Sequence, residues 1–245
     1  MKEILAFIGI DDTDTRKGKV SGAGKGTGRV AREAAKALLN AGYRVLWVLR
    51  HQMLKSERIS TPGNNSSKSV TLEVKSREEA ERALRIVTDV VRKLAAPNSN
   101  AGLALLIGVP PSGKALHLAM KAKKEFVSLD EVLRVANACD IHAIKLLGNG
   151  SGIIGAFAAA VLASTGNDGR VLDIPSTGIR ELKDEFVLVK KLLDLGVAEV
   201  RSLDGVKLSE HEVVALGKAK PVLRKFKPVL YVKRVGLDWL AVKVE

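Results

Sequence analysis

The amino-acid sequence predicts an α/β (α+β) fold built on a mixed β-sheet. Short apolar runs that suit buried strands alternate with longer segments whose apolar residues recur at helical spacing. The character of the chain changes near residue 171, after which it is basic and strand-rich. We therefore expect an α/β region over residues 1–170 and a small, basic β-rich module over residues 171–245.

The first strand is expected at residues 3–10, where EILAFIGI is almost wholly apolar. A polar, glycine-rich loop follows as far as Gly28, and residues 29–41 then have helical spacing before Gly42 ends the helix. The next elements are expected as a strand at 43–50, a strand at 69–75, a helix at 76–96 and a strand at 103–109. This order over residues 43–109 suits a ferredoxin-like subdomain.

The second half of the α/β region is expected to be mainly helical. Helices at 114–122 and 128–140 precede a short strand at 142–147. A glycine-rich loop then leads into a helix of small apolar residues, GNGSGIIGAFAAAVLAS, at 148–164.

The C-terminal module is predicted from weaker signals. The segment DEFVLVKKLLDLGV suits a helix, and Asp204-Gly205 suits the turn of a hairpin. Pro221 and Pro228 lie in strand-like sequence, and proline within a strand usually indicates the edge of a sheet.

The composition favours an anionic partner. The 245 residues include 40 Lys and Arg against 27 acidic residues, a formal net charge of +13, which suits nucleotides, RNA or DNA. The alternative is a charged, solubilising surface. The single cysteine, Cys139, excludes an internal disulfide and a zinc–cysteine cluster. With no apolar run of about 18 residues and no leader-like start, we expect a cytoplasmic protein without membrane contact.

Three carboxylates directly follow the first predicted strand. Asp11, Asp12 and Asp14 lie in GIDDTDT, alternating with Thr13 and Thr15. Carboxylates so close together repel one another unless a cation lies among them, and oxygen ligands of this kind suit Mg²⁺. A helix cap explains one such residue but not three. We therefore predict that Asp11, Asp12 and Asp14 bind a metal ion.

A glycine-rich segment, GKVSGAGKGTGR at 18–29, precedes the first helix. Backbone N–H groups exposed by glycine, together with a helix N-terminus, form a site for an anion such as phosphate. A flexible loop is the alternative, because the spacing is not that of a P-loop. The predicted phosphate-binding residues are Gly24, Lys25, Gly26, Gly28 and Arg29.

A second glycine-rich segment, GNGSGIIGAF at 148–157, also opens a helix. Gly152 and Gly155 are candidates for a second contact with the nucleotide. The alternative is that these glycines allow close packing of the helix on the sheet.

Polar residues also gather at 61–69 (TPGNNSSKS) and around His51. These side chains suit hydrogen bonds to a small ligand, but they equally suit an ordinary loop. Of the four histidines, His51 is predicted to be the one most suited to chemistry because its neighbours are polar.

The last candidate is a basic stretch near the C-terminus, in which Phe226 and Tyr231 lie among the cations. Cations with interleaved aromatic residues suit single-stranded nucleic acid, although a charged edge strand has the same composition. The basic residues are Lys218, Lys220, Arg224, Lys225, Lys227, Lys233 and Arg234.

Together, GIDDTD after the first strand, a glycine-rich segment ending in a hydroxyl residue, and later GSGIIGA resemble the archaeal tRNA-isoleucine agmatinylcytidine synthetase family (TiaS). The resemblance covers roughly residues 4–160. It implies a kinase-like catalytic domain with an accompanying ferredoxin-like domain. Enzymes of the family use ATP to attach agmatine to a tRNA cytidine, and they phosphorylate that cytidine and a threonine of their own.

Transferred by motif, the resemblance makes Asp11, Asp12 and Asp14 the carboxylates that handle Mg²⁺ and phosphate. Gly24-Lys25-Gly26-Thr27 stands where the family has GMCT, so Thr27 corresponds to the phosphorylated threonine, with Ser21 as the alternative. The later GLIGA segment of the family corresponds to residues 152–156. The chain has no cysteines for the family's zinc ribbon, so a stand-alone catalytic unit with another acceptor is expected.

Two functional hypotheses follow. The first is an ATP- and Mg²⁺-dependent, kinase-like transferase or ligase, with RNA among the candidate acceptors and homo-oligomers allowed. The alternative is a non-catalytic, basic nucleic-acid-binding protein, whose binding would fall steeply with salt.

Overall fold

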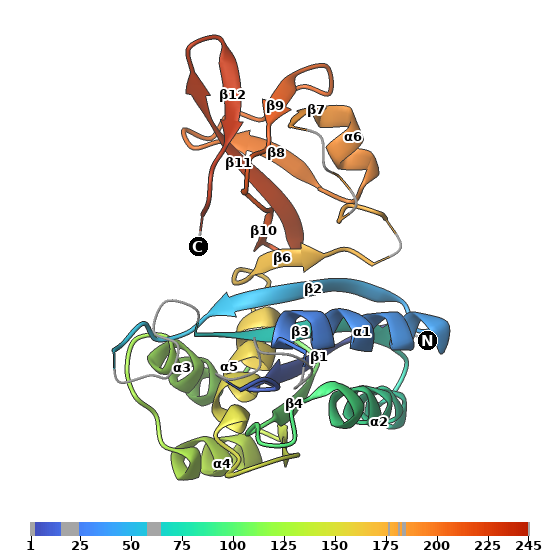
Figure 1. Ribbon diagram of the computed structural model, residues 1–245, viewed down its shortest axis with the longest axis vertical. Helices are drawn as coiled ribbons and strands as arrows, with labels where there is room; N and C mark the ends of the chain where they lie inside the picture. Colours follow the sequence, from blue (N-terminus) through green and yellow to red (C-terminus); the bar gives the residue numbers. More distant parts are fainter. Residues whose placement is uncertain are drawn as a thin grey trace.

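The computed structural model describes residues 3–15, 25–57, 65–175, 177–180, 182 and 185–244, which form twelve strands and six helices (Figure 1). The strands are β1 (Ile4–Asp11), β2 (Val45–Gln52), β3 (Ser66–Val74), β4 (Gly102–Ile107), β5 (His142–Lys145), β6 (Arg170–Asp173), β7 (Phe186–Leu188), β8 (Glu199–Ser202), β9 (Val213–Ala215), β10 (Val222–Arg224), β11 (Lys227–Val235) and β12 (Asp238–Ala241). The helices are α1 (Thr27–Asn40), α2 (Arg77–Leu94), α3 (Gly113–Ala122), α4 (Leu129–Ala138), α5 (Gly152–Ser164) and α6 (Val189–Asp194).

All of these strands belong to one mixed sheet, which confirms the predicted fold class. Their order is β5-β4-β1-β3-β2-β6-β10-β11-β12-β9-β7, and β8 pairs with β11 beside this path. Most pairs are antiparallel, whereas β8 with β11 and β9 with β12 are parallel. None of the helices in the described part of the chain is long and apolar enough to cross a bilayer.

The N-terminal half has the ferredoxin-like arrangement. β1, α1, β2, β3, α2 and β4 follow one another in the chain, and their strands lie in the antiparallel order β4-β1-β3-β2. The unit therefore begins at β1, earlier than the predicted range 43–109. The reason is that β1 inserts between β3 and β4, a pairing that the local pattern does not reveal.

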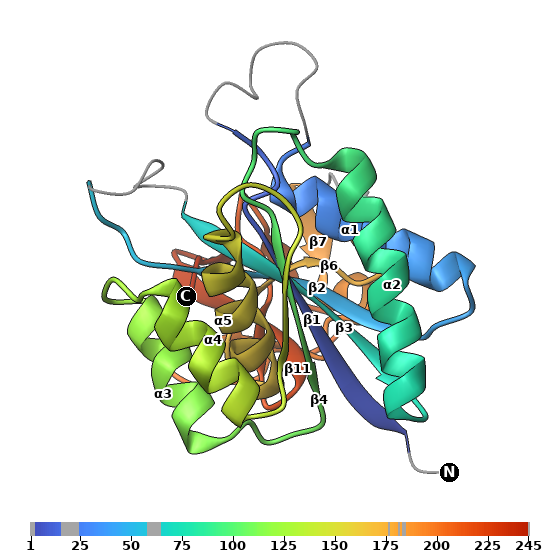
Figure 2. The same ribbon diagram turned by 90° about the horizontal axis from the view of Figure 1, so that it is seen from below.

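Two layers of helices cover opposite faces of this sheet, with α1 and α2 on one side and α3, α4 and α5 on the other (Figure 2). Alternate residues of β1 serve the two cores: Ala6 and Ile8 face α1 and α2, whereas Phe7 faces α5. α5 is apolar on all sides and nearly every residue of it is buried.

The approach of α5 to the sheet requires glycine. A Cβ atom on Gly9 of β1 would lie 1.8 Å from the carbonyl oxygen of Ala156, and one on Gly102 of β4 would lie 2.3 Å from the amide nitrogen of Ile153. Side chains at these two positions would push the helix away from the strands. The start of α5 is therefore fixed against the ends of β1 and β4.

The C-terminal strands and α6 surround a core of their own. The segment predicted as one helix divides into β7 and the short α6, so that prediction is wrong for residues 186–188. Pro228 lies at the start of β11, which pairs with β8, β10 and β12, so it is not on an edge strand. The turn at Asp204-Gly205 is confirmed, with the Gly205 amide bonded to the Ser202 carbonyl.

The division into 1–170 and 171–245 remains a prediction. β6, which spans this boundary, pairs with β2 on one side and with β10 on the other. The sheet is therefore continuous from the ferredoxin-like unit into the C-terminal strands.

We expect Gly9→Ala to reduce the free energy of unfolding by about 1–3 kcal/mol, because the new methyl group overpacks the contact with Ala156. Gly113→Ala is the matched control: a Cβ there meets no atom within 4 Å, and alanine suits the first turn of α3. Urea denaturation of both variants tests this. Equal stability of the two would contradict the packing described for α5.

Candidate functional site

A cavity of about 950 Å³ lies where β1 ends. This volume falls within the range of roughly 300–1,000 Å³ typical of small-molecule sites. Its walls come from the loop after β1, the first turn of α1, the ends of β2 and β3, the α3–α4 loop and the first turn of α5. The predicted site residues among those that line it are Asp11, Asp12, Asp14, Gly26, Thr27, Gly28, Arg29, Gly152 and Gly155.

Other predicted residues lie elsewhere. Lys25 does not line the cavity, and its backbone amide instead donates to the carbonyl of Leu94 at the end of α2. Gly24 and the alternative hydroxyl, Ser21, are outside the described residues. A smaller cavity of about 160 Å³ lies beside β6 and contains none of the predicted catalytic residues.

Asp11 and Asp12 diverge because they face different partners. Asp11 ends β1 and points toward α5, where a Cβ on Gly155 would lie 1.8 Å from Oδ2. Asp12 has a left-handed backbone with φ 55°, and its Oδ2 accepts a hydrogen bond of 3.3 Å from Ser151 Oγ. Aspartate adopts this conformation more readily than most residues, and it turns the chain away from the strand.

Burial dominates the titration of both carboxyls. It raises the pKa of Asp11 to about 7, with the charge of Lys68 opposing this and Asp12 adding to it. Burial also raises the pKa of Asp12, against hydrogen bonds from Ser151 and Asn100. Two carboxyls with raised pKa values in one cavity form a site that a bound cation would stabilise.

Asp14 points to the start of α1 and not to the other two carboxylates. Thr27 Oγ1 donates to Asp14 Oδ1 at 3.4 Å and accepts from Thr13 Oγ1 at 3.1 Å. Within the described ranges, no group of three His, Cys, Asp or Glu side chains is arranged to hold one metal ion. Within the described residues the expected convergence of three carboxylates on one ion is therefore not seen, although all three line the cavity and the charge of Asp14 acts on Asp11 and Asp12.

Lys68 is the main site residue that sequence reasoning missed. It lines the cavity from β3, is only 9% exposed, and donates from Nζ to the backbone oxygen of Ser66 at 2.6 Å. Burial lowers its pKa, an effect that Asp11 opposes and Arg50 reinforces. The sequence signal for this role is that a lysine lies within a strand-forming run whose residues are about half apolar.

The two helices that open onto the cavity lack side-chain caps. α1 starts after Gly26 and α5 after Ser151, neither with a capping hydrogen bond and neither with an acidic residue in its first turn. By contrast, α2, α3 and α4 each begin with a serine whose hydroxyl accepts from the backbone. The N-terminus of α1 is thus left for another anion, whereas the first amides of α5 already donate to the carbonyls of Asn100, Gly150 and Ser151.

Gly152 and Gly155 meet the requirements of packing as well as lining the cavity. A Cβ on Gly152 would lie 2.5 Å from the carbonyl oxygen of Asn100, and one on Gly155 would displace Asp11. The geometry therefore requires glycine at both positions for close packing of the helix, which is the alternative role predicted for them. The same closeness brings the first turn of α5 beside the carboxylates.

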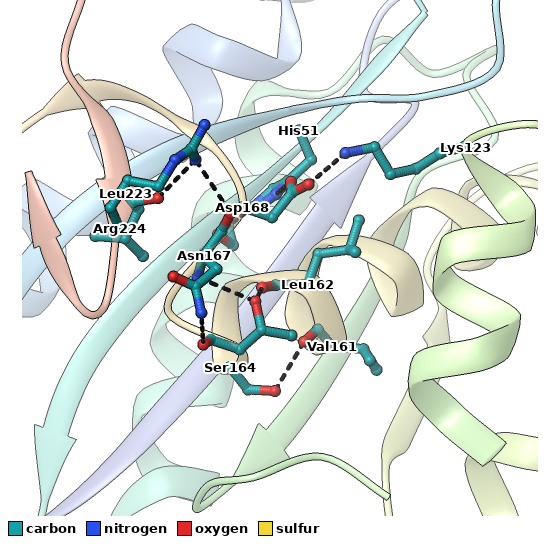
Figure 3. Close-up of polar contacts among 11 residues, drawn as sticks. His51, Lys123, Val161, Leu162, Ser164, Asn167, Asp168, Leu223 and Arg224 are labelled. Atoms are coloured by element: carbon teal, nitrogen blue, oxygen red, sulfur yellow. Dashed lines mark hydrogen bonds and ion pairs between the residues drawn. The ribbon is translucent and has the colours of Figure 1, made fainter. Parts of the chain in front are cut away.

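His51 does not line the cavity, so its predicted role in chemistry is not supported. It is fully buried, with Nδ1 2.7 Å from Asp168 Oδ1 and Nε2 2.8 Å from Ser69 Oγ, and Lys123 forms an ion pair with Asp168 (Figure 3). The order resembles a Ser-His-Asp triad, but Ser69 is also fully buried and no substrate can reach it. The cluster instead joins β2, β3, the end of α3 and the turn after α5.

Asp168 is the shared partner of His51 and Lys123 in this cluster. Burial alone would raise its pKa, but the hydrogen bond and charge of His51 and the ammonium of Lys123 hold it well below the usual range. The backbone oxygen of the neighbouring Asn167 accepts from Arg224 of the C-terminal module (Figure 3). Its Oδ1 accepts from the backbone amide of Lys225. The cluster therefore supports a wall of the cavity and contacts the β10–β11 turn.

The cations of the basic stretch are exposed, except that Arg224 is half-buried. Phe226 packs against Gly166 and the core beside α5, and Tyr231 is half-buried on β11, so the predicted aromatic platform is absent at Phe226. Arg234 lies over the ring of Trp239 at 4.9 Å. What remains is an exposed set of cations along β10, β11 and their flanking turns.

Solved structures share this fold. TiaS without ligand, a tRNA agmatidine synthetase, is 23% identical with a TM-score of 0.51 over 64% of this chain and 35% of its own. A tRNA fluorescent labeling enzyme is 23% identical with a TM-score of 0.53 over 64% and 36%. TiaS in complex with its isoleucine tRNA and ATP is 24% identical with a TM-score of 0.51 over 64% and 36%.

These likenesses confirm the fold that the sequence resemblance implied. The chain covers little more than a third of each of these structures, so the likeness concerns only part of them. No protein-family profile and no curated protein matches the chain.

We expect Asp11→Asn to raise the thermal stability of the ligand-free protein at pH 8. A carboxyl with a raised pKa in the folded state costs stability once it ionises, so stability falls as pH rises from about 4 toward 7. The variant should therefore gain clearly more at pH 8 than at pH 5. Differential scanning fluorimetry at both values tests this, with Asp89→Asn, exposed on α2, as the control.

We expect Asp168→Asn to lower the free energy of unfolding by up to about 3 kcal/mol, because Lys123 and His51 lose their buried partner. A lowered pKa means that the stabilisation is fully present above the ordinary aspartate pKa, so the loss should appear at both pH 5 and pH 8. The control, Asp140→Asn, breaks an exposed pair with Arg77 and should cost less than about 1 kcal/mol. Equal losses in urea denaturation would refute the role given to Asp168.

Proposed function

We propose that this chain binds ATP with Mg²⁺ in the cavity at the end of β1 and transfers a phosphoryl group to an acceptor. One observation carries the proposal: two uncapped helix N-termini, two carboxyls with raised pKa values and a buried lysine all border one cavity. The solved structures of TiaS with tRNA and ATP support it as an analogy of fold.

The cavity has the charge that a triphosphate requires. The first turn of α1 provides N–H dipoles, and Lys68, Arg29 and Arg50 provide full positive charges at its walls. The glycines at the start of this helix have no side chain to hold a phosphate away from the backbone. Phosphoryl transfer depends mainly on such positioning and electrostatic stabilisation.

The carboxylates fit Mg²⁺ as well. Magnesium in phosphate sites usually takes one or two carboxylates, with waters and phosphate oxygens completing its shell, so three convergent aspartates are not needed. Asp11 and Asp12 would hold the ion, and bound Mg²⁺ would neutralise charge on the phosphates. The charge of the ion would also favour the ionised form of both carboxyls and so offset the effect of burial, which raises their pKa values.

The hydroxyl of Thr27, which lines the cavity, is the described candidate for a phosphoryl acceptor within the chain that also contacts a carboxylate predicted to be catalytic. Its Oγ1 lies 3.4 Å from Asp14 Oδ1, so Asp14 would accept the hydroxyl proton as a general base. The family resemblance also points to Thr27. In this proposal Asp14 acts on Thr27, and Asp11 and Asp12 act on the metal.

The external acceptor in this proposal is a nucleic acid, with RNA as the leading candidate. The exposed cations along β10 and β11 favour a polyanion, and one of the TiaS structures contains a tRNA. The non-catalytic alternative predicts nucleic-acid binding without ATP turnover.

We expect isothermal titration to give micromolar binding of ATP with Mg²⁺, and Asp12→Asn to weaken it at least tenfold. Asparagine keeps the left-handed backbone at this position, so the variant removes the charge without straining the turn. Asp130→Asn, exposed on α4, is the control. No binding to the wild-type protein at millimolar ATP would refute the proposed function.

Activity is tested separately with ATP labelled at the γ-phosphate. Label should transfer to the protein or to added RNA, and Thr27→Val should abolish the protein-bound label. Tight ATP binding without any transfer would indicate a nucleotide-binding protein that is not an enzyme.

A further inference from the structure

Three cations stand in one row across neighbouring strands beside the cavity. In the sheet register, Arg50 of β2 is opposite Lys68 of β3 on one side and opposite Arg170 of β6 on the other. Directly opposed residues point to the same face, with Cβ atoms about 4.5–5.5 Å apart. Like charges in such positions are destabilising, so this row needs an explanation.

A fourth cation lies over the row from α1. A Cβ placed on Gly28 would be 3.7 Å from Arg32 Nη1 and also 3.7 Å from Lys68 Cε. The missing side chain of Gly28 therefore leaves Arg32 and Lys68 on either side of one small space. The cation row is defined here as Lys68, Arg50, Arg170 and Arg32.

Two members of the cation row have unused hydrogen-bonding capacity. The Nε atoms of Arg32 and Arg170 are buried and have no hydrogen-bond partner. A buried guanidinium nitrogen without an acceptor is costly, and an arginine at such a place is suited to bind a phosphate. Lys68 and Arg50 line the large cavity, whereas Arg32 and Arg170 lie beyond its lining.

The acidic residues near the cation row leave part of its positive charge for a bound anion. Asp11 and Asp14 act on Lys68, while Asp173 and Glu33 act on Arg32. In the proposed function Asp11 binds Mg²⁺ and Asp14 serves Thr27. When these two carboxylates are so engaged, the cation row loses part of its compensation.

We propose that Arg170 and Arg32, the members of the cation row beyond the lining of the cavity, form a second phosphate subsite that holds a phosphate of the acceptor, while Lys68 and Arg50 face the ATP triphosphate. The row leads from the cavity through β2 to β6, which also pairs with β10 of the basic module. An acceptor phosphate held at Arg170 and Arg32 would keep the acceptor next to the cavity. This inference rests on the proposed function for the identity of the acceptor, but not for the binding of phosphate.

The test measures binding of two probes, a fluorescein-labelled single-stranded RNA oligonucleotide and cytidine monophosphate. Arg170→Gln and Arg32→Gln should each weaken phosphate-dependent binding about tenfold, as the loss of a charged hydrogen bond does, and leave the affinity for ATP with Mg²⁺ within twofold. Each should also lower the salt slope of oligonucleotide binding by about 0.7. Lys36→Gln, exposed one turn further along α1, should change neither affinity.

The two probes separate the sources of the phosphate. Oligonucleotide binding that depends on the row, with weak monophosphate binding, assigns the subsite to a nucleic-acid strand; equal dependence for both assigns it to a single phosphate group. Unchanged binding of both probes in Arg170→Gln and Arg32→Gln, relative to Lys36→Gln, would overturn the proposal. So would an equal loss of ATP affinity, because the row would then belong to the triphosphate site.

Thermal stability provides a check on folding. Without phosphate, Arg170→Gln should be at least as stable as the wild type, because one like-charge contact is removed. Added inorganic phosphate should stabilise the wild type more than this variant. If the wild type fails to bind ATP but shows row-dependent phosphate binding, the proposed function fails and the subsite stands.

Discussion

The close contact between α5 and the strand β1 is the constraint on which the site depends. Gly9 and Gly102 allow the helix to lie directly on the strand backbones, and Gly155 allows it to lie against the Asp11 side chain. This contact covers one side of the carboxyl, and burial raises the pKa of Asp11. The glycines that allow close packing of the core therefore also determine the surroundings of the carboxyl in the cavity.

The same arrangement leaves the ligand-free site electrostatically unfavourable. Carboxyls with raised pKa values, a lysine with a lowered pKa, two uncapped helices and a row of like charges all lie around one cavity. Away from it, α2, α3 and α4 have serine caps, and the short α6 is the further helix of the described chain without one. Departures from local rules that gather in one place indicate a site selected for binding and not for stability.

Much of this could be predicted from the sequence, and the rest depended on pairing between distant segments. The helical periodicity of residues 29–41 and the apolar run at 3–10 gave α1 and β1 to within two residues, and the strand end followed by aspartates gave the position of the cavity. Lys68 was missed because its importance comes from lying opposite Arg50. His51 was misjudged because its partner, Asp168, is 117 residues away and buries it. The ferredoxin-like unit was predicted without its first strand for the same reason.

Because the sheet is continuous, the segment that contains β6 takes part in several of these long-range pairings. β6 joins β2, which lines the cavity, to β10, which begins the basic hairpin, and the turn before β6 carries Asp168 and Asn167. One short segment therefore supports the cavity wall through His51, holds the β10–β11 turn through Lys225, and supplies Arg170 to the cation row. A change in this segment would alter the wall, the basic surface and the cations together. Residues 167–173 are therefore the structural connection between the cavity wall and the C-terminal surface.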